Sequence, residues 1–335
     1  MSEAAPYRIF GIELSPYSVK VRSYFRYKGI PHTWVVRSGD QMEEFRRYAK
    51  LPLIPLVVGS DGSSLQDSTP ILERLEALYP EPGIHPSDPV AAFVSALVEE
   101  YADEWGNKPM FHYRWTYAAD QQSAAERIAR ANAPDAPAAQ LGALSGAIRE
   151  RMVPRLSFVG SNAATRDTIE TSFQRQARIL EAHLAARPYL FGARPAFADF
   201  GAYAQLYQCW SDPTPGAWLR AETPRVVAWI ERMLAPKALG PFEPWRALEP
   251  TLAPLLRDEI AGCFLPWSDA NARALAAGAA EFDLELGGRP FRQQTQKYHA
   301  RSLAALRERY AAAADGGPLD ATLERTGCRR WLAGA

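Results

Sequence analysis

The chain has 335 residues, which is enough for two domains with a large buried core. Its 38 basic and 38 acidic residues cancel, so the charge balance favours neither a nucleic acid nor a membrane as a partner. The three cysteines are far apart, no signal peptide is visible, and no apolar run approaches the ~20 residues of a membrane helix. These features predict a soluble protein of the reducing cytoplasm.

The first predicted elements are a strand at 7–11 and a helix that starts at Pro16. Proline suits the first turn of a helix, because its missing N–H would have no partner there. Ser15 therefore stands at a helix N-terminus, where unpaired N–H groups and the helix dipole favour an anion. A serine that only caps the helix is the structural alternative, and the two roles are compatible.

The next elements are a strand at 32–37, a polar helix at 40–50, a hairpin at 51–66 and a helix that starts after Asp67. The first two strands must be parallel, because a helix crosses between them, whereas the last two form a hairpin. This order of strands and helices predicts an α/β domain with the thioredoxin-like layout.

Short motifs in this region resemble those of known families. The sequence Ser-Pro-Tyr-Ser at 15–18 resembles the Cys-Pro-Tyr-Cys of glutaredoxins, with hydroxyls in place of both sulfurs, which excludes a dithiol cycle. Thioredoxin-like folds also carry a cis-proline at the position of Pro55. Three motifs together resemble the serine-type glutathione S-transferase superfamily: Ser15-Pro16, Ile54-Pro55, and Asp67-Ser68 with Ile71.

The resemblance covers residues 7–235 and implies a glutathione site. Glutathione would lie extended beside Ile54 and Pro55 and pair with the backbone of Ile54 as an extra strand. Asp67 and Ser68 would hold its γ-glutamyl end, and Ser15 would stabilise its thiolate. A plain helix cap is the alternative role for Asp67 and Ser68.

One position departs from the family pattern. Many members have a lysine just before the Val-Pro step, which reaches the glycine carboxylate of glutathione, but here that residue is Leu53. Lys50 is the nearest lysine and is the predicted substitute, with Arg37 as a second candidate.

A proline-rich linker at 79–89 predicts a second, helical domain after it. The helical stretch at 90–119 is rich in aromatic residues, with a kink expected near Gly106 and Pro109. In the resembled family this helix forms a wall of the electrophile cleft. The predicted substrate pocket comprises Tyr17, Tyr101, Trp105 and Phe111. The alternative for such aromatic residues is the core of a helix bundle.

The chain continues about a hundred residues beyond the resemblance. Helices are predicted at 251–264 and 269–282, followed by a turn at Gly287-Gly288 and another helix around Leu306. A run of polar residues at 293–299 is interpreted as a solvated helix start.

The sequence thus predicts a thioredoxin-like glutathione-binding domain at 1–80, a helical domain at 90–235 and a mostly helical extension at 236–335. The implied function is transfer of glutathione to a small apolar electrophile, by a homodimer and without a metal, because the five histidines show no ligand spacing. The alternative is a transferase-like binding or assembly module without catalysis, favoured by Leu53 and by the extension.

Overall fold

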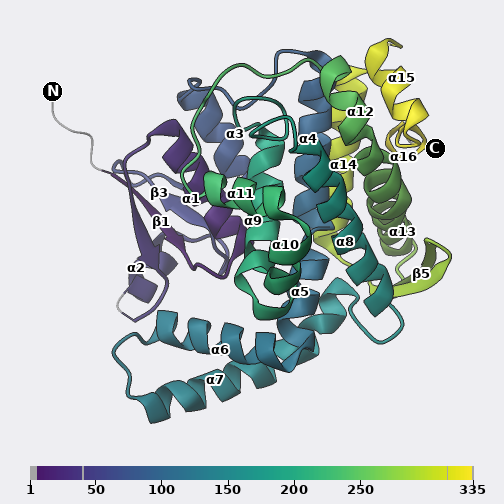
Figure 1. Ribbon diagram of the computed structural model, residues 1–335. Helices are drawn as coiled ribbons and strands as arrows, with labels where there is room; N and C mark the ends of the chain where they lie inside the picture. Colours follow the sequence, from purple (N-terminus) through teal and green to yellow (C-terminus); the bar gives the residue numbers. More distant parts are fainter. Residues whose placement is uncertain (1–5, 40, 315, 334–335) are drawn as a thin grey trace, which may run out of the picture.

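The computed structural model describes residues 6–39, 41–314 and 316–333. Its N-terminal part contains one sheet in the order β2-β1-β3-β4, with β1 parallel to β2 and antiparallel to β3. The elements of this part are β1 (Tyr7–Gly11), α1 (Pro16–Lys28), β2 (His32–Val36), α2 (Gln41–Tyr48), β3 (Leu56–Val58), β4 (Ser64–Gln66) and α3 (Ser68–Leu78). This confirms the thioredoxin-like layout (Figure 1). The first residue of the helix predicted at 40–50 lies outside the described residues.

The alternation of side chains along the central strands explains why helices lie on both faces of this sheet. Ile9 and Val57 point to one face and belong to the main hydrophobic core, which includes apolar residues of α1 and α3. Phe10 and Leu56 point to the other face and pack with Phe45 of α2. Because successive strand residues face opposite sides, each strand serves two cores.

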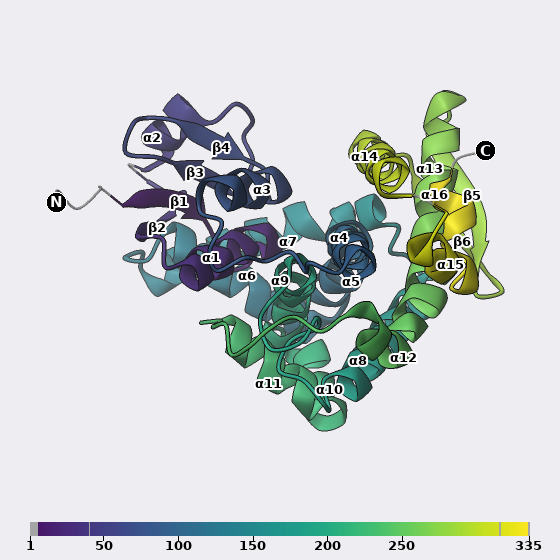
Figure 2. The ribbon, with the colours of Figure 1, turned by 90° about the horizontal axis from the view of Figure 1, so that it is seen from above.

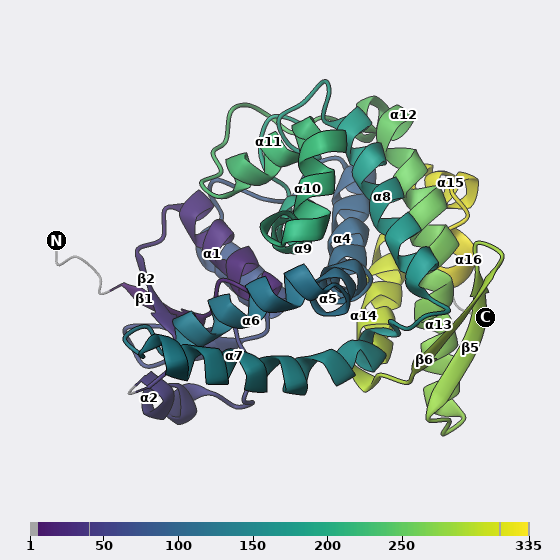
Figure 3. The same ribbon diagram turned by 60° about the horizontal axis from the view of Figure 1, so that its bottom comes forward.

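A bundle of helices follows, as predicted. Its helices are α4 (Pro89–Glu104), α5 (Asn107–Thr116), α6 (Ala118–Asn132), α7 (Ala138–Met152), α8 (Arg166–His183), α9 (Phe197–Ser211), α10 (Pro213–Glu222) and α11 (Pro224–Met233). Helices α4 and α9 lie side by side, and α9 also contacts α1 of the N-terminal domain (Figure 1). Helices α6 and α7 form an antiparallel pair, which lies below α9 in the view of Figure 3. The predicted kink is the break between α4 and α5 at Gly106.

Asp199 fixes the start of α9 from a fully buried position. Its Oδ2 accepts a hydrogen bond from the N–H of Ala196 at 2.9 Å, and its Oδ1 accepts from Leu190 N–H and Trp229 Nε1–H. Burial raises the pKa of this carboxyl to about 7, although the backbone hydrogen bonds lower it. Asp199 therefore has a structural role at the start of α9, where Ala196 stands at the cap position and supplies no hydroxyl.

The extension forms a second helical layer against α4 and α8. Its elements are α12 (Trp245–Leu255), the π-helical segment Leu256–Phe264, α13 (Leu265–Ala276), β5 (Glu281–Leu286), β6 (Arg289–Gln294), α14 (Lys297–Ala313), α15 (Pro318–Arg325) and α16 (Arg329–Leu332). The hairpin around Gly287-Gly288 is confirmed. Within the described residues, no helix combines the length and apolar character that crossing a membrane requires.

Three predictions for the extension were wrong. Helical structure is continuous from α12 to α13, without the predicted break after 264. The helix predicted at 269–282 ends at Ala276, because Phe282 is buried as part of β5 instead. Gln293 is not solvated: it is 2% exposed, accepts a hydrogen bond from Lys108 Nζ at 2.7 Å and another from Trp267 Nε1.

Helix α14 brings the end of the chain back to the N-terminal domain. It packs along α4, where the ring of Tyr310 contacts that of Phe93, and Leu303, Leu306 and Tyr310 are all nearly inaccessible. Seen from above, α3 and α14 stand on either side of α4 (Figure 2). The extension therefore lies next to the domain that carries the predicted glutathione site.

Candidate functional site

The sheet register brings the three predicted motifs to one edge of the N-terminal domain. Phe10 at the end of β1 pairs with Leu56 at the start of β3, and Leu56 pairs with Gln66 at the end of β4. The loop that follows β1 leads to Ser15, Pro55 precedes β3, and Asp67 follows β4. Backbone pairing alone therefore places these motifs side by side.

Ser15 caps α1 and keeps its own hydroxyl hydrogen available. Its Oγ accepts a hydrogen bond from the N–H of Ser18 at 3.2 Å, and its side chain is partly exposed. Among the described residues, the Ser15 hydroxyl donates to no acceptor. A hydroxyl can donate and accept at once, so capping leaves Ser15 free to donate to a ligand at the helix N-terminus.

The loop that carries Ser15 is fastened by the helical domain. Arg114 of α5, 3% exposed, donates from Nη1 to the carbonyl of Leu14 at 2.9 Å, and Gln208 of α9 donates to the carbonyl of Glu13 at 2.8 Å. Arg114 is itself held by Asp212 and Gln208. These buried charge-assisted bonds fix the position of Ser15 relative to α5.

The Ile54-Pro55 peptide is cis, as predicted. In the described part of the chain, the backbone N–H and C=O of Ile54 have no hydrogen-bond partner. The preceding loop is organised by Gln66, whose Oε1 accepts from the N–H groups of Lys50 and Leu51 and whose Nε2 donates to Leu51 and Leu53 carbonyls. The backbone N–H and C=O of Ile54 are therefore available to a ligand, and the loop that carries them is ordered.

Lys50 and Arg37 border the same loop. The Lys50 side chain is exposed and has no ion pair among the described residues, while Leu53 is 61% exposed. Arg37 donates from Nη1 to the carbonyl of Pro52 at 2.8 Å and lies over the ring of Phe45. Lys50 is therefore the more available cation beside Leu53.

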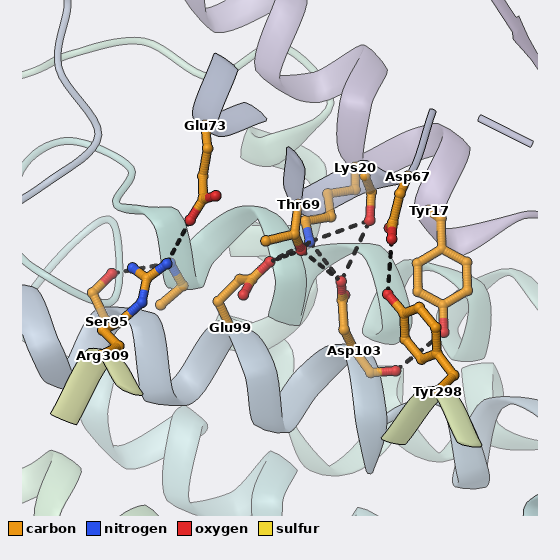
Figure 4. Close-up of polar contacts among 12 residues, drawn as sticks. Tyr17, Lys20, Asp67, Thr69, Glu73, Ser95, Glu99, Asp103, Tyr298 and Arg309 are labelled. Atoms are coloured by element: carbon orange, nitrogen blue, oxygen red, sulfur yellow. Dashed lines mark hydrogen bonds and ion pairs between the residues drawn. The ribbon is translucent and has the colours of Figure 1, made fainter. Parts of the chain in front are cut away.

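Asp67 has an unusual backbone conformation. Its φ is +76°, a value that favours glycine, and it is the one described non-glycine residue with positive φ. Holding such a conformation costs on the order of 1–3 kcal/mol and is common at ligand sites. Its exposed carboxylate accepts a hydrogen bond through Oδ2 from the hydroxyl of Tyr298, at 3.0 Å. Tyr298 belongs to α14, so the extension contacts the predicted site directly (Figure 4).

The Ser68 side chain is not available to a ligand. It is 1% exposed, and its hydroxyl takes part in a buried network centred on Lys20, whose Nζ donates to it at 3.4 Å. Lys20 also pairs with Glu99 and with Asp103 Oδ2, and donates to Thr69 at 3.1 Å (Figure 4). Only the backbone N–H of Ser68, at the start of α3, remains for an anionic group.

The Lys20 network links α1, α3 and α4 inside the protein. Burial opposes the charge on Lys20, but Asp103 and Glu99 raise its pKa above the ordinary value. Burial raises the pKa of both Glu99 and Asp103, and Lys20 counteracts this rise only in part. The network therefore holds the starts of α1 and α3 in place at a cost in desolvation.

The predicted substrate-pocket residues separate into two groups. Phe111 is partly buried in the cluster that contains Leu14, next to Ser15, and Tyr17 is partly exposed. The Tyr17 hydroxyl donates to the carbonyl of Asp103 at 3.1 Å, and burial raises its pKa. These two residues lie near Ser15, but the Tyr17 hydroxyl already has an acceptor.

Tyr101 and Trp105 face the extension instead of a cleft. They are 0% and 1% exposed, so neither offers surface to a ligand. The Tyr101 hydroxyl donates to Glu259 at 3.2 Å, and Trp105 packs against Trp267, with their ring centroids 5.7 Å apart. The extension covers this face of α4, which corrects the prediction that these rings line the substrate pocket.

A cavity of about 300 Å³ lies between α3, α4 and α14, next to Asp67. Carboxylates dominate its α4 side, and two arginines, Arg301 and Arg309, come from α14. Burial and neighbouring carboxylates, Glu99 first among them, raise the pKa of Glu100 well above its ordinary value. Within the described residues, no group of three or more His, Cys, Asp or Glu side chains has the arrangement to hold a metal ion.

Sequence reasoning missed the residues that position this site from a distance. Arg114 and Gln208 contact the loop before Ser15, and Tyr298 contacts Asp67, across 100 to 231 residues of chain. The role of Gln66, which orders the loop before Ile54, was missed as well. Gln66 lies next to Asp67 at the end of a strand, and this polar position is the one local signal that could have indicated its role.

Residues 9–83 match the family model described as the glutathione S-transferase N-terminal domain, and residues 163–232 match the glutathione S-transferase C-terminal domain. No curated protein matches the chain.

Three solved structures illustrate the structural similarity. A glutathione S-transferase from Methylobacterium radiotolerans JCM 2831, in complex with glutathione sulfonate, shares 20% identity over 71% of this chain and 96% of its own, with a TM-score of 0.44. A beta-etherase from Sphingobium sp. strain SYK-6 shares 21% identity over 68% of this chain and 95% of its own, with a TM-score of 0.46. A glutathione transferase from Phanerochaete chrysosporium shares 18% identity over 70% of this chain and 98% of its own, with a TM-score of 0.49. The chain therefore contains an N-terminal and a C-terminal domain of the glutathione S-transferase superfamily, at residues 9–83 and 163–232.

Proposed function

We propose that the protein is a glutathione transferase in which Ser15 stabilises the thiolate of glutathione. The observation that carries this proposal is the convergence of Ser15, the unpaired backbone of Ile54 and the strained Asp67 at one edge of the sheet. Glutathione would pair with Ile54 as an added strand and extend its γ-glutamyl end towards Asp67. Pro55 shapes this loop, the Ser68 N–H faces the γ-glutamyl carboxylate, and Lys50 faces the glycine carboxylate.

The proposed chemistry needs only a hydrogen-bond donor at a helix N-terminus. A free thiol has a pKa near 8.5, so at neutral pH only a small share of it is ionised. The hydroxyl of Ser15 and the N-terminus of α1 both favour the anion, which raises the nucleophilic share. A small apolar electrophile would lie against Phe111 and Tyr17, where proximity contributes the rest of the acceleration.

Replacing Asp67 by asparagine should weaken glutathione binding about tenfold or more, because it removes a charged contact worth roughly 1.5–3 kcal/mol. Asparagine tolerates positive φ, so the backbone conformation should persist. Isothermal titration calorimetry measures the effect. Asp135→Asn, in the exposed loop between α6 and α7, is the matched control and should bind normally. A wild-type protein that releases no heat with millimolar glutathione would contradict the proposed function itself.

A binding or assembly module without catalysis is the second candidate. Two observations favour it: the exposed Leu53 at the usual lysine position, and the contact of the extension with Asp67. The two candidates differ in turnover, so a protein that binds glutathione but conjugates no electrophile from a broad panel would support the module.

We also propose a cytoplasmic homodimer. The three cysteines are free and buried, which suits a reducing compartment, and homodimers are usual in this superfamily. Multi-angle light scattering at micromolar concentration should give about twice the 37.1 kDa of one chain. A mass equal to one chain would contradict the dimer and leave the glutathione site unaffected.

A further inference from the structure

The extension reaches the proposed glutathione site through a firmly anchored helix. Gln296, just before α14, exchanges two hydrogen bonds with Asn271 of α13, at 2.8 and 2.9 Å, and Asn271 is fully buried. His299 pairs with Glu104 of α4 and packs edge-on against Trp267. Between these anchors Tyr298 projects towards the N-terminal domain, so its contact with Asp67 is set by a rigid helix.

The same helix places an unpaired, exposed arginine at the wall of the cavity beside Asp67. Arg301 follows Tyr298 by three positions, so both side chains lie on one face of α14. Arg309, the other arginine of this cavity, pairs with Glu73 of α3. Among the residues that the structure describes, Arg301 has neither an ion pair nor a hydrogen bond.

We propose that α14 completes the glutathione site from within the same chain, with Tyr298 positioning Asp67 and Arg301 binding the α-carboxylate of the γ-glutamyl group. The inference rests on the proposed function and assigns a role to the extension. The ligand group in question is zwitterionic, with an ammonium and a carboxylate on one carbon. Asp67 would accept the ammonium, because Tyr298 occupies only Oδ2 and leaves Oδ1 without a partner in the described structure.

The electrostatics of the cavity explain why a cation is needed for the carboxylate. The α4 wall carries Glu99, Glu100, Asp103 and Glu104, and Lys20 offsets the charge of two of them. The basic residues that line the cavity are Arg301 and Arg309, and Arg309 is paired with Glu73. The hydroxyl of Ser68 is already used in the Lys20 network and is not available to the carboxylate. A guanidinium binds a carboxylate through two parallel N–H donors, so Arg301 supplies both the charge and the geometry.

The first experiment combines protein variants with ligand analogues and measures each binding affinity by calorimetry. Arg301→Ala should bind glutathione about tenfold or more weakly, whereas Arg309→Ala should bind like wild type because its charge is paired with Glu73. Glutathione that lacks the α-carboxylate (γ-aminobutyryl-cysteinyl-glycine) should bind wild type and Arg301→Ala equally. Equal glutathione affinity in wild type and Arg301→Ala would overturn the inference, and so would an equal loss in Arg309→Ala.

The second experiment separates positioning from general stability. Tyr298→Phe removes the hydroxyl that holds Asp67 and should weaken glutathione binding several-fold. The same variant should bind the analogue without the α-ammonium (glutaryl-cysteinyl-glycine) as wild type does. Equal losses for both ligands would overturn the positioning role. If wild type itself binds no glutathione, the proposed function fails together with this inference, whereas normal wild-type binding with an unaffected Arg301→Ala overturns the inference alone.

Discussion

Replacing Ser15 by alanine should raise the pKa of bound glutathione towards that of the free thiol while leaving its affinity nearly unchanged. The side chain of Ser15 donates to no other group in the described structure, so its hydrogen is free for the sulfur. Each unit of pKa that is lost corresponds to about 1.4 kcal/mol of thiolate stabilisation. Conjugation should therefore fall most at neutral pH and recover as the pH rises above the pKa of the free thiol.

Ultraviolet absorbance of the bound thiolate, titrated against pH, reports this directly. Ser18→Ala is the matched control on the same helix turn. The Ser18 hydroxyl is buried without a partner, and the substitution keeps the Ser18 N–H that donates a hydrogen bond to Ser15 Oγ. The loss of the cap in Ser15→Ala costs about 1 kcal/mol of stability, which thermal unfolding measures separately. Identical titration curves for wild type and Ser15→Ala would reduce Ser15 to a helix cap and favour the binding module.

The N-terminal domain could be predicted closely because its signals are local. The strand before Ser15, the proline at the first turn of α1 and the polar pair at the start of α3 each encode their own conformation within a few residues. The hairpin sets the register of β3 and β4, and the predicted thioredoxin-like layout places β1 beside β3, so the convergence of the motifs followed from the layout. The family pattern added the cis peptide before Pro55.

The contributions of the helical part and of the extension to the site could not be predicted in the same way. Helical periodicity shows that one face of α4 is apolar, but not which segment covers it, so Tyr101 and Trp105 were assigned to a pocket although the extension buries them. Likewise, the contact between Tyr298 and Asp67 joins residues 231 positions apart, and no local pattern encodes such a pair. Gln293 was misread for the same reason, because its partner Lys108 comes from α5.

Replacing Lys20 by methionine should destabilise the fold by about 3–5 kcal/mol, because it leaves two buried carboxylates without their cation. Lys20 is fully buried, and its Nζ lies 2.6 Å from Asp103 Oδ2 and also pairs with Glu99. The network ties α1 to α3 and α4, so the loss also loosens the helix starts that carry Ser15 and Ser68. Urea unfolding at neutral pH measures the change in free energy.

The effect of Lys20→Met should depend on pH, with a sign that follows from the two carboxyls. Burial already raises the pKa of Glu99 and Asp103 in the native protein, and removal of Lys20 raises both further. An acid with a raised native pKa binds its proton more tightly in the folded than in the unfolded state, so folding gains stability as the pH falls towards that pKa. The deficit of the variant should therefore be larger at pH 8 than at pH 5.

Two further variants show whether the unpaired charge is the cause. Adding Glu99→Gln and Asp103→Asn to Lys20→Met removes both charges and should recover most of the lost stability. Arg292→Met breaks an ion pair with Asp283 whose side chains are 66% and 63% exposed, and should leave the free energy of unfolding nearly unchanged. A deficit of Lys20→Met that is independent of pH, or that the triple variant leaves unchanged, would show that packing of the lysine stem, and not its charge, joins α1 to α3 and α4.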